Sequence, residues 1–514
     1  MAALVSIVIP VYNAAPYLEA CLKSVLRQTY QSLEVLIIND GSTDESEEIV
    51  KRFTTADSRL SLYSQENHGL GYTRNRGISL CSGAYVFFLD SDDLIPEKAI
   101  ESLVIPAETH QADYAVGKVM RLTEERRYIP KRHADFGLYN KDESVTIHER
   151  PEMLQDSIAC NKLWKREFLV QQNLLFTEGK YYEDLNMTMR AAVLAKKIAV
   201  TREVVYLWRV REDENKPSIT QQQMKLQNTQ DRLRALLLNR KWLVQSAIEP
   251  RIISEHDLKS LLDVVRLHVI KYSLVQPAER EEWQREISSF LQQIPEDAAV
   301  KLPRKERTLY ALLKEKNYGD LLLFSEMYTN TETRPIVKQN GARFELQGEN
   351  NVYDVTPDLK PKIVVNEITR SEMNWELRGS VIVPKASLPV DAAFYGVGRA
   401  GSGSSVSQPI SLEQADVSGL YPYETQSFTV NLNPKLYREE AVYDFYFSLI
   451  GNDADEHQEA RVRIHPSAIK DRHILKLQNS VLTLYRTKQG NLSLRSQKNT
   501  LKQKVKTLIK KILK

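Results

Sequence analysis

Residues 85–93 read Tyr-Val-Phe-Phe-Leu-Asp-Ser-Asp-Asp, an apolar and aromatic run that changes abruptly into an acidic cluster. Such a run is typical of a strand that is buried on both faces. Two carboxylates, Asp90 and Asp92, stand one residue apart at the end of this strand. Sheets of parallel strands bind ligands beyond the carboxyl ends of their strands. We therefore expect this stretch to decide both the fold and the chemistry of the N-terminal part.

The sequence on either side of this run alternates between strand and helix patterns. Strands are expected at residues 4–9, 34–39, 60–64, 85–89 and 114–120, and helices at residues 18–26, 44–53, 71–81 and 97–109. This alternation predicts an α/β domain with a mostly parallel, Rossmann-like sheet covered by helices on both faces. A polar or aromatic side chain follows each of the first four strands: Tyr12, Asp40, Asn67 and Asp90. We expect these four to share one edge of the sheet.

The rest of the chain changes pattern three times, which predicts four parts. After the α/β domain, which we place at residues 1–222, apolar residues recur at helical spacing and predict a helical linker domain at residues 223–330. Short β-rich runs divided by Gly, Pro, Asn and Asp then predict an antiparallel, immunoglobulin-like β-sandwich at residues 331–466. Residues 467–514 form a basic tail, with an expected hairpin around Gly490 and an amphipathic helix at residues 499–514.

Composition bounds the compartment and the partners. A chain of 514 residues is too long to fold around a single hydrophobic core, so we expect several domains. The sequence contains no run of about 18 apolar residues, so it predicts no membrane-spanning helix. Three widely separated cysteines predict buried thiols in a reducing compartment, so we expect a cytoplasmic protein. Residues 470–514 hold 13 basic residues and one acidic residue. This tail predicts peripheral contact with the anionic inner face of the membrane, or an oligomer-forming or disordered segment; no nucleic-acid partner is predicted.

The pair Asp90 and Asp92 has two interpretations. Carboxylates so placed can face a divalent cation together with the diphosphate that the cation neutralises, and hard oxygen ligands suit Mg²⁺ or Mn²⁺. The pair can equally be a solvated acidic turn before the next helix. An Asp-x-Asp triplet alone does not separate these interpretations, so its neighbours along the chain have to be considered together.

Five segments stand out by their order and spacing: VSIVIPVYN (5–13), LRQTY (26–30), EVLIINDGSTD (34–44), ENHGLGYTRNRG (66–77) and FLDSDD (88–93). Together they resemble the family 2 inverting glycosyltransferases of the GT-A fold. The resemblance covers about residues 4–220 and implies a nucleotide-sugar site formed by Pro10, Tyr12, Asp40, Asn67, Arg74, Asp90 and Ser91.

The resemblance also implies a role for each of these residues. Pro10 and Tyr12 would hold the uracil, and Asp40 would accept a hydrogen bond from its imide. Asn67 and Arg74 would hold the nucleotide and diphosphate, Asp90 and Ser91 would lie beside the donor, and Asp92 would bind Mn²⁺ or Mg²⁺.

Two further segments are assigned to catalysis and the acceptor. The pair Glu183-Asp184 corresponds to the family's catalytic carboxylates, so Asp184 is expected to act as general base with Glu183 in support. The alternative is an acid pair that caps a helix N-terminus. Arg209 and Arg211 are expected to bind the diphosphate or an anionic acceptor; the alternative is an ion-paired surface.

The whole-chain layout is similar to that of the wall teichoic acid glycosyltransferases of Gram-positive bacteria. This likeness implies transfer of N-acetylglucosamine or another hexose from a UDP-sugar to an anionic cell-surface polymer. It also implies a homo-oligomer, a trimer in that family, assembled through the C-terminal domain. The Gln-x-x-Arg-Trp motif of processive synthases is absent from the sequence. Two alternatives stay open: capsule or exopolysaccharide synthesis, and a carbohydrate-binding module carrying a degenerate transferase domain.

Overall fold

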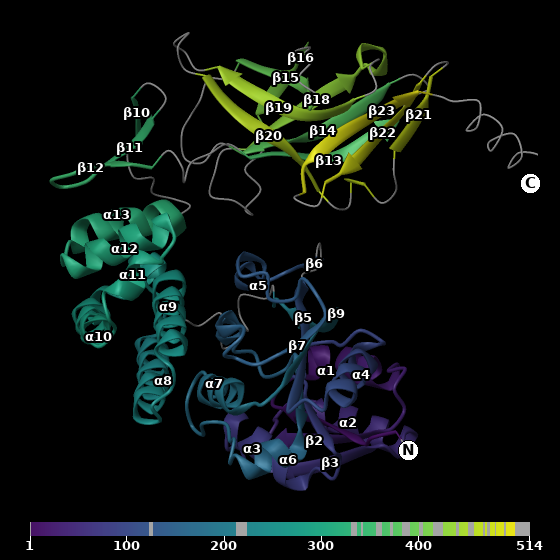
Figure 1. Cartoon of the computed structure of the whole chain (residues 1–514), viewed down its shortest axis with the longest axis vertical. Helices are drawn as coiled ribbons and strands as arrows, with labels where there is room; N and C mark the ends of the chain where they lie inside the picture. The colour runs from purple at the N-terminus through teal and green to yellow at the C-terminus, as the bar shows by residue number, and fades with distance from the viewer. Residues whose placement is uncertain are drawn as a thin grey trace, which may run out of the picture. The chain divides into compact units, whose positions relative to one another are not determined.

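The protein is described by a computed structural model, which divides into two compact units, Met1–Lys316 and Asn317–Lys514 (Figure 1). The structure describes residues 2–122, 127–211, 224–329, 337–340, 343–355, 362–370, 374–382, 391–399, 405–414, 425–437, 441–450, 457–465, 468–469, 473–477, 480–487 and 490–498. The amphipathic helix predicted at residues 499–514 lies outside this range.

The first unit is built on one mixed sheet, with strand order β3-β2-β1-β4-β8-β5-β9-β7 and β6 paired to β5. Its strands are β1 (Val5–Val11), β2 (Leu33–Asp40), β3 (Leu60–Gln65), β4 (Tyr85–Phe88), β5 (Tyr114–Leu122), β6 (Arg127–Tyr128), β7 (Glu143–Val145), β8 (Lys162–Lys165) and β9 (Ile198–Arg209). β1 pairs in parallel with β2 and β4, and β2 with β3. The carboxyl ends of these four strands therefore share one edge, as the sequence predicted.

Helices cover both faces of this sheet; Figure 1 shows α1 and α4 on one face and α3 on the other. The helices up to β9 are α1 (Ala15–Leu26), α2 (Ser46–Ala56), α3 (Leu70–Leu80), α4 (Ala99–His110), α5 (Lys131–Asp135), α6 (Arg166–Gln171) and α7 (Asp184–Leu194). In α1 the buried residues Leu18, Cys21, Leu22 and Val25 recur at the spacing of one helical face. That apolar stripe is the reason why the segment forms a helix against the sheet.

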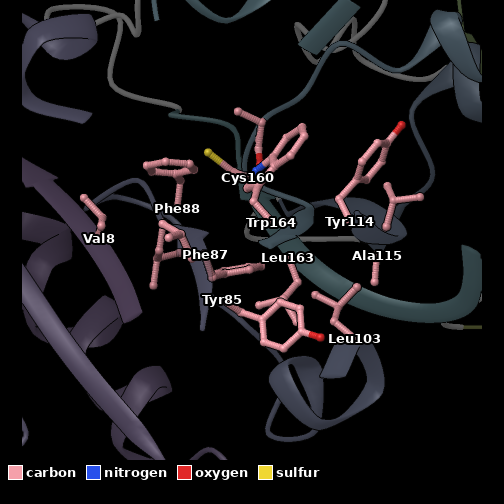
Figure 2. Close-up of a cluster of buried hydrophobic side chains, with 14 of the residues drawn as sticks. Val8, Tyr85, Phe87, Phe88, Leu103, Tyr114, Ala115, Cys160, Leu163 and Trp164 are labelled. Atoms are coloured by element: carbon pink, nitrogen blue, oxygen red, sulfur yellow. The ribbon is translucent and has the colours of Figure 1, made fainter. Parts of the chain in front are cut away.

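The core of the first unit is formed around the central strands of the sheet, β1 and β4, and the strands beside them. All seven residues of β1 are buried, which explains why this central strand reads as a continuous apolar run. Figure 2 shows Phe87 and Phe88 of β4, Trp164 of β8 and Tyr114 of β5 among the buried side chains of this core. The rings of Tyr114 and Trp164 are 4.9 Å apart between centroids, and both side chains are almost fully buried. The three cysteines are buried free thiols, as predicted.

A run of helices completes the first unit, as the sequence predicted after the transferase-like part. They are α8 (Leu226–Gln245), α9 (Pro250–Leu267), α10 (Arg280–Gln292), α11 (Asp297–Val300) and α12 (Arg304–Lys314). Helix α8 packs against α7, and α9 packs against α8. Among the helices that the structure describes, none combines the length and the apolar character needed to cross a bilayer.

The second unit is rich in antiparallel strands. It contains α13 (Tyr318–Thr329), a three-stranded sheet and an eleven-stranded sheet. The strands are β10 (Val337–Asn340), β11 (Arg343–Gln347), β12 (Val352–Asp354), β13 (Lys362–Arg370), β14 (Trp375–Ile382), β15 (Asp391–Gly398), β16 (Ser405–Pro409), β17 (Ser411–Gln414), β18 (Thr425–Leu432), β19 (Val442–Ile450), β20 (His457–Ile464), β21 (His473–Lys476), β22 (Ser480–Arg486) and β23 (Leu492–Lys498).

The large sheet folds back on itself. Phe428 of β18 and Phe447 of β19 are 4.7 Å apart between ring centroids, although β18 and β19 are not neighbours in strand order. Strands β21–β23 join the same sheet, because β23 pairs with both β22 and β19. The sheet therefore continues past the boundary predicted at residue 466. The hairpin predicted around Gly490 consists of β22 and β23, while residues 473–476 form the separate strand β21.

Candidate active site

The side chains predicted from the strand ends lie at the carboxyl edge of β1–β4. Tyr12 follows β1 and is 53% exposed, so about half of it is accessible to a ligand. Pro10 is buried within β1. The loop that carries Tyr12 is tied to the loop after β2, because Asn13 Oδ1 accepts a hydrogen bond from the Thr43 backbone N–H at 2.8 Å. The Ala15 N–H in turn donates to Asp44 Oδ2 at 3.1 Å.

Asp40 holds the loop after β3 in place. Its Oδ1 accepts hydrogen bonds from Gln65 Nε2 at 2.6 Å and from the His68 N–H at 2.9 Å. Its Oδ2 accepts from the Gly69 N–H at 2.9 Å. These bonds position Asn67, whose side chain is exposed on the same edge. A carboxylate offers about four acceptor positions, so these bonds leave one of them unoccupied, and Asp40 is only 3% exposed.

Arg74 of α3 joins two parts of the site that the sequence separates widely. Its guanidinium donates from Nη1 to Glu183 Oε1 at 2.5 Å and from Nη2 to Asp90 Oδ1 at 2.6 Å. The side chain is only 3% exposed. Burial alone lowers the pKa of Arg74, but Asp90, Cys160, Glu183 and Asp184 outweigh it and raise that pKa well above its usual value. Arg74 is therefore a permanent cation between carboxylates.

The acidic cluster after β4 is fastened to the end of β9. Asp93 is buried and accepts hydrogen bonds from Tyr206 Oη at 2.6 Å and from the Arg209 N–H at 2.7 Å. Burial, followed by Asp92 and Asp90, raises the pKa of Asp93 well above its usual value. Asp93 thus anchors the cluster. Ser91 is buried beside it, and Asp90 is part-exposed.

Asp92 faces the two arginines that the sequence assigned to a diphosphate or an acceptor. Arg211 forms an ion pair with Asp92 Oδ2 at 2.7 Å, and Arg209 Nε donates to the Asp92 backbone carbonyl at 2.7 Å. The ring of Tyr17 on α1 lies 5.4 Å from Arg209 and 5.3 Å from Arg211, measured from each Cζ to the ring centroid. Burial raises the pKa of Asp92, and Arg211 acts against this.

Asp90 and Asp92 can bind a divalent cation only if a substrate supplies further ligands. Within the described residues, no three His, Cys, Asp or Glu side chains converge as a complete metal site. A hard cation at a diphosphate is usually held by one or two carboxylates, with phosphate oxygens and water as its remaining ligands. Asp92 and the part-exposed Asp90 can supply such a pair.

Glu183 and Asp184 stand at the start of α7, and Glu183 forms an ion pair with Arg74. Glu183 is 7% exposed and is held by Arg74, whereas Asp184 opens the first turn of the helix. Burial, followed by the charge of Glu183, raises the pKa of Asp184 to about 7, although Arg74 and Arg232 act in the opposite direction. A carboxylate with such a pKa can take up a proton at neutral pH.

Several site residues were not identified from the sequence. Tyr17 directly precedes the predicted helix at residues 18–26, and Tyr206 lies three residues before Arg209, but neither was assigned a role. Asp231 and Arg232 of α8 contact the segment before Asp184, since Asp231 Oδ2 accepts a hydrogen bond from the Tyr181 N–H at 3.3 Å. No local signal could reveal these roles, because each depends on which distant element packs against the site. A separate hollow of about 560 Å³ lies at the opposite edge of the sheet, beside Ser82–Ala84 and α6.

The amino-acid sequence matches known transferases over its N-terminal part. Residues 6–171 match the family described as Glycosyl transferase family 2. The glycosyltransferase GlyA of Streptococcus pneumoniae is 36% identical over 214 residues, which are 40% of this chain and 30% of GlyA. The glycosyltransferase GlyG of the same organism is 32% identical over 223 residues, which are 41% of this chain and 72% of GlyG. A poly(ribitol-phosphate) beta-glucosyltransferase of Bacillus spizizenii is 27% identical over 307 residues, which are 57% of this chain and 46% of that protein.

The fold is similar to that of solved structures over almost its whole length. The crystal structure of S. aureus TarS matches 97% of this chain and 86% of TarS, with a TM-score of 0.60 at 18% identity. The structure of TarS 1–349 in complex with UDP-GlcNAc matches 68% of this chain and 98% of that chain, with a TM-score of 0.52 at 20% identity. This likeness confirms the predicted fold class: a GT-A part, then helices, then a strand-rich C-terminal part.

Proposed function

The chain belongs to glycosyltransferase family 2, and from this premise we propose that it transfers a sugar from a UDP-sugar to an anionic cell-surface polymer with inversion at the anomeric carbon. One observation carries the proposal. The buried guanidinium of Arg74 binds Asp90 on the donor side and Glu183 on the acceptor side. One rigid group therefore fixes the distance between the two halves of a transfer site.

The donor half is formed by the loops after β1–β4. Tyr12 offers an exposed ring to the uracil, beside the buried Pro10. Asp40 has an acceptor position left for the imide N–H, and it places the exposed Asn67 toward the nucleotide. We assign Asp90 and Ser91 to the donor sugar, as the sequence predicts. Arg74 differs from the sequence-based expectation: its terminal nitrogens already donate to carboxylates, so we assign it to positioning them and not to the diphosphate.

Mn²⁺ or Mg²⁺ fits this half through Asp92, with Asp90 next to it. When bound, the ion would neutralise the diphosphate that leaves with the uridine. In the free protein Arg211 forms the ion pair with Asp92, and Arg209 lies beside it. Both arginines carry a planar guanidinium, which pairs well with phosphate oxygens, and we assign them to the diphosphate or to a phosphate of the acceptor.

The acceptor half depends on Asp184. As the acceptor hydroxyl attacks the anomeric carbon, the Asp184 carboxylate takes its proton, and the bond between the sugar and the diphosphate breaks. A pKa of about 7 suits this task, because a substantial fraction of the carboxylate is ionised near pH 7 and still binds the proton well. Glu183, held by Arg74, supports Asp184 from the preceding position.

The acceptor class is inferred from relatives. A poly(ribitol-phosphate) glucosyltransferase is similar over 57% of this chain, and TarS, whose structure holds UDP-GlcNAc, has the same layout of parts. We therefore propose a teichoic-acid-like polyol phosphate as acceptor and N-acetylglucosamine or another hexose as the sugar. Such a reaction belongs at the cytoplasmic face of the membrane. Assembly through the C-terminal unit, and contact of the basic tail with anionic lipid, are proposals of the same kind.

The decisive experiment compares donors and acceptors on one protein. Binding of UDP-glucose, UDP-N-acetylglucosamine and UDP-galactose is measured by calorimetry with Mn²⁺ present. Transfer from the bound donor is then measured on poly(ribitol phosphate) and poly(glycerol phosphate). Asp184→Asn should keep donor binding and lose transfer. Failure of every UDP-sugar to bind, or full transfer by Asp184→Asn, would overturn the proposal.

A further inference from the structure

The segment that carries the proposed base has an unusual backbone. Tyr182, two residues before Asp184, has a φ of +59°, in the left-handed region that side chains other than glycine rarely adopt. Gly179 nearby has a φ of +66°, which glycine accepts freely. A strained residue such as Tyr182 persists only when its surroundings hold it. Contacts from neighbouring elements must therefore hold residues 180–185 in this conformation.

Helix α8 supplies those contacts. The Cζ atom of Arg232 lies 3.6 Å from the centroid of the Tyr182 ring, which places the guanidinium on the ring face. The neighbouring Asp231 accepts from the Tyr181 N–H at 3.3 Å, and its Oδ1 is 3.3 Å from Lys180 Nζ.

Two helical turns further along α8, Asn239 also contacts this segment. Its Nδ2 donates to the Leu185 carbonyl at 3.1 Å. Side chains of α8 therefore grip the chain on both sides of the Glu183-Asp184 pair.

Arg232 is built into this position. It is 6% exposed, and its Nη1 lies 3.8 Å from Asp263 Oδ2 on α9. Asp263 is shared with two further cations, Lys259 at 2.6 Å and Arg132. One buried carboxylate therefore faces three cations. Within the described residues, Arg232 Nε is buried without a hydrogen-bond partner.

We infer that Arg232, together with Asp231, positions the carboxylate of Asp184, so that the helices following the transferase part complete its active site. The inference rests on the proposed role of Asp184 as base. Arg232 contributes in two ways. Its planar face fixes the ring of Tyr182, and thereby the backbone that leads to Asp184. Its charge favours the ionised carboxylate, which is the form that accepts a proton.

The charges around Asp184 determine the sign of the effect. Four groups face it: Glu183 beside it, Arg74 from α3, Lys162 from β8 and Arg232 from α8. Burial and Glu183 raise the pKa of Asp184, while Arg74 and Arg232 lower it. Removing the Arg232 charge should therefore raise this pKa further. Because the base works only when ionised, the acid limb of the pH profile should move to higher pH.

The test measures kcat/KM against pH by UDP release from UDP-N-acetylglucosamine, with poly(ribitol phosphate) as acceptor. Arg232→Met removes the charge, and its acid limb should rise by about half a pH unit or more, with a several-fold loss of turnover at pH 7. Arg232→Lys keeps the charge but not the planar face, so its limb should stay in place while turnover falls. Arg234→Met, exposed on the same helix, is the matched control and should match the wild type. UDP affinity, measured by calorimetry, should be unchanged in all three variants.

Two results would overturn the inference. One is an acid limb that does not move upward in Arg232→Met. The other is wild-type turnover in Arg232→Lys, which decides the matter even if Arg232→Met fails to fold. Asp184→Asn separates this inference from the function beneath it. If Asp184→Asn keeps transfer, the base assignment fails. If Asp184→Asn is inactive and the limb of Arg232→Met stays in place, only the positioning role fails.

Discussion

The guanidinium of Arg74 is buried and bound at both ends, by Asp90 at Nη2 and by Glu183 at Nη1. Removing Arg74 leaves the buried Glu183 and the part-exposed Asp90 without a compensating charge. We expect Arg74→Met to lower the free energy of unfolding by about 3 to 5 kcal/mol. Arg74→Lys should fall between this variant and the wild type, because one ammonium group lacks the fork that reaches two carboxylates. Urea denaturation followed by circular dichroism measures both.

The control for this series is Arg52→Met. Arg52 lies on α2 with its side chain 67% exposed, so its loss should change stability by less than about 0.5 kcal/mol. An Arg74→Met variant as stable as Arg52→Met would contradict the view that Arg74 links the two halves of the site.

Ionisation of Asp184 should lower the stability of the folded protein near neutral pH. An aspartate in an unfolded chain ionises near about pH 3.9, whereas the pKa of Asp184 in the folded protein is about 7. Between these values the folded state keeps a proton that the unfolded state loses. The contribution of Asp184 to the free energy of unfolding therefore falls as pH rises from about 4 to about 7.

Asp184→Asn removes this titration. The variant should be more stable than the wild type at pH 8, on the order of 1 kcal/mol or more, and no more stable at pH 4. Urea titrations at the two pH values measure the difference, with Glu281→Gln, an exposed carboxylate on α10, as control. Equal stability of wild type and Asp184→Asn at pH 8 would show that the pKa of Asp184 is not raised.

The sequence motifs identified which charged side chains belong to the site, but not which of them form ion pairs with one another. The sequence indicates that Arg74 stands near the site, yet its partner Glu183 is 109 positions away. Whether an arginine has donors free for a ligand depends on such partners. The same applies to Arg211, which forms an ion pair with Asp92 across a similar separation. Pairing of this kind follows from tertiary structure alone.

At the level of elements, the turn after β2 and the loop after β3 depend on one glycine. Gly41 has a φ of +74°, and a Cβ atom there would meet the Asn67 backbone nitrogen at 2.9 Å. The residue before it, Asp40, holds the same loop through the N–H groups of His68 and Gly69. We expect Gly41→Ala to cost about 1 to 3 kcal/mol of stability and to weaken UDP binding, because it pushes Asn67 from its place.

Gly179→Ala is the matched control. Its φ is +66°, but no atom lies within 4 Å of the added Cβ. This variant should show the backbone cost without a loss of UDP affinity, since residue 179 lies on the acceptor side. Calorimetry with UDP compares the two variants, and equal affinity for UDP in both would contradict the role of Gly41 in placing Asn67.

The elements that the sequence predicted well are those with a strong local pattern. Strands β1–β4 and helices α1–α4 agree with their predicted ranges within a few residues, because apolar spacing specifies both the type of element and its buried face. The role of α8 was not predictable. Helical spacing shows that one face is buried, but not that Arg232 on that face contacts Tyr182. The pairing of β23 with β19 is likewise a contact between distant segments.

At the level of the whole molecule, each unit has its own core. The buried residues of the apolar core around β1 and β4 lie between Val5 and Ile252, and those of the core in the C-terminal unit lie between Ile363 and Leu494. Every proposed donor and base residue, and every α8 residue near them, lies within Met1–Lys316. These two facts favour a transferase that is complete in the first unit.

A chain ending at Lys316 should therefore fold cooperatively and bind UDP with the affinity of the full chain. It should also hydrolyse the UDP-sugar slowly, because water can replace the acceptor. Thermal melting, calorimetry and UDP release measure these properties, and light scattering compares subunit number. If the C-terminal unit assembles subunits, the shortened chain will be a monomer beside an oligomeric full chain. If that unit binds polymer instead, subunit number will stay the same and only the KM for the polymer will rise. Loss of UDP binding on shortening would show that the site needs residues beyond Lys316.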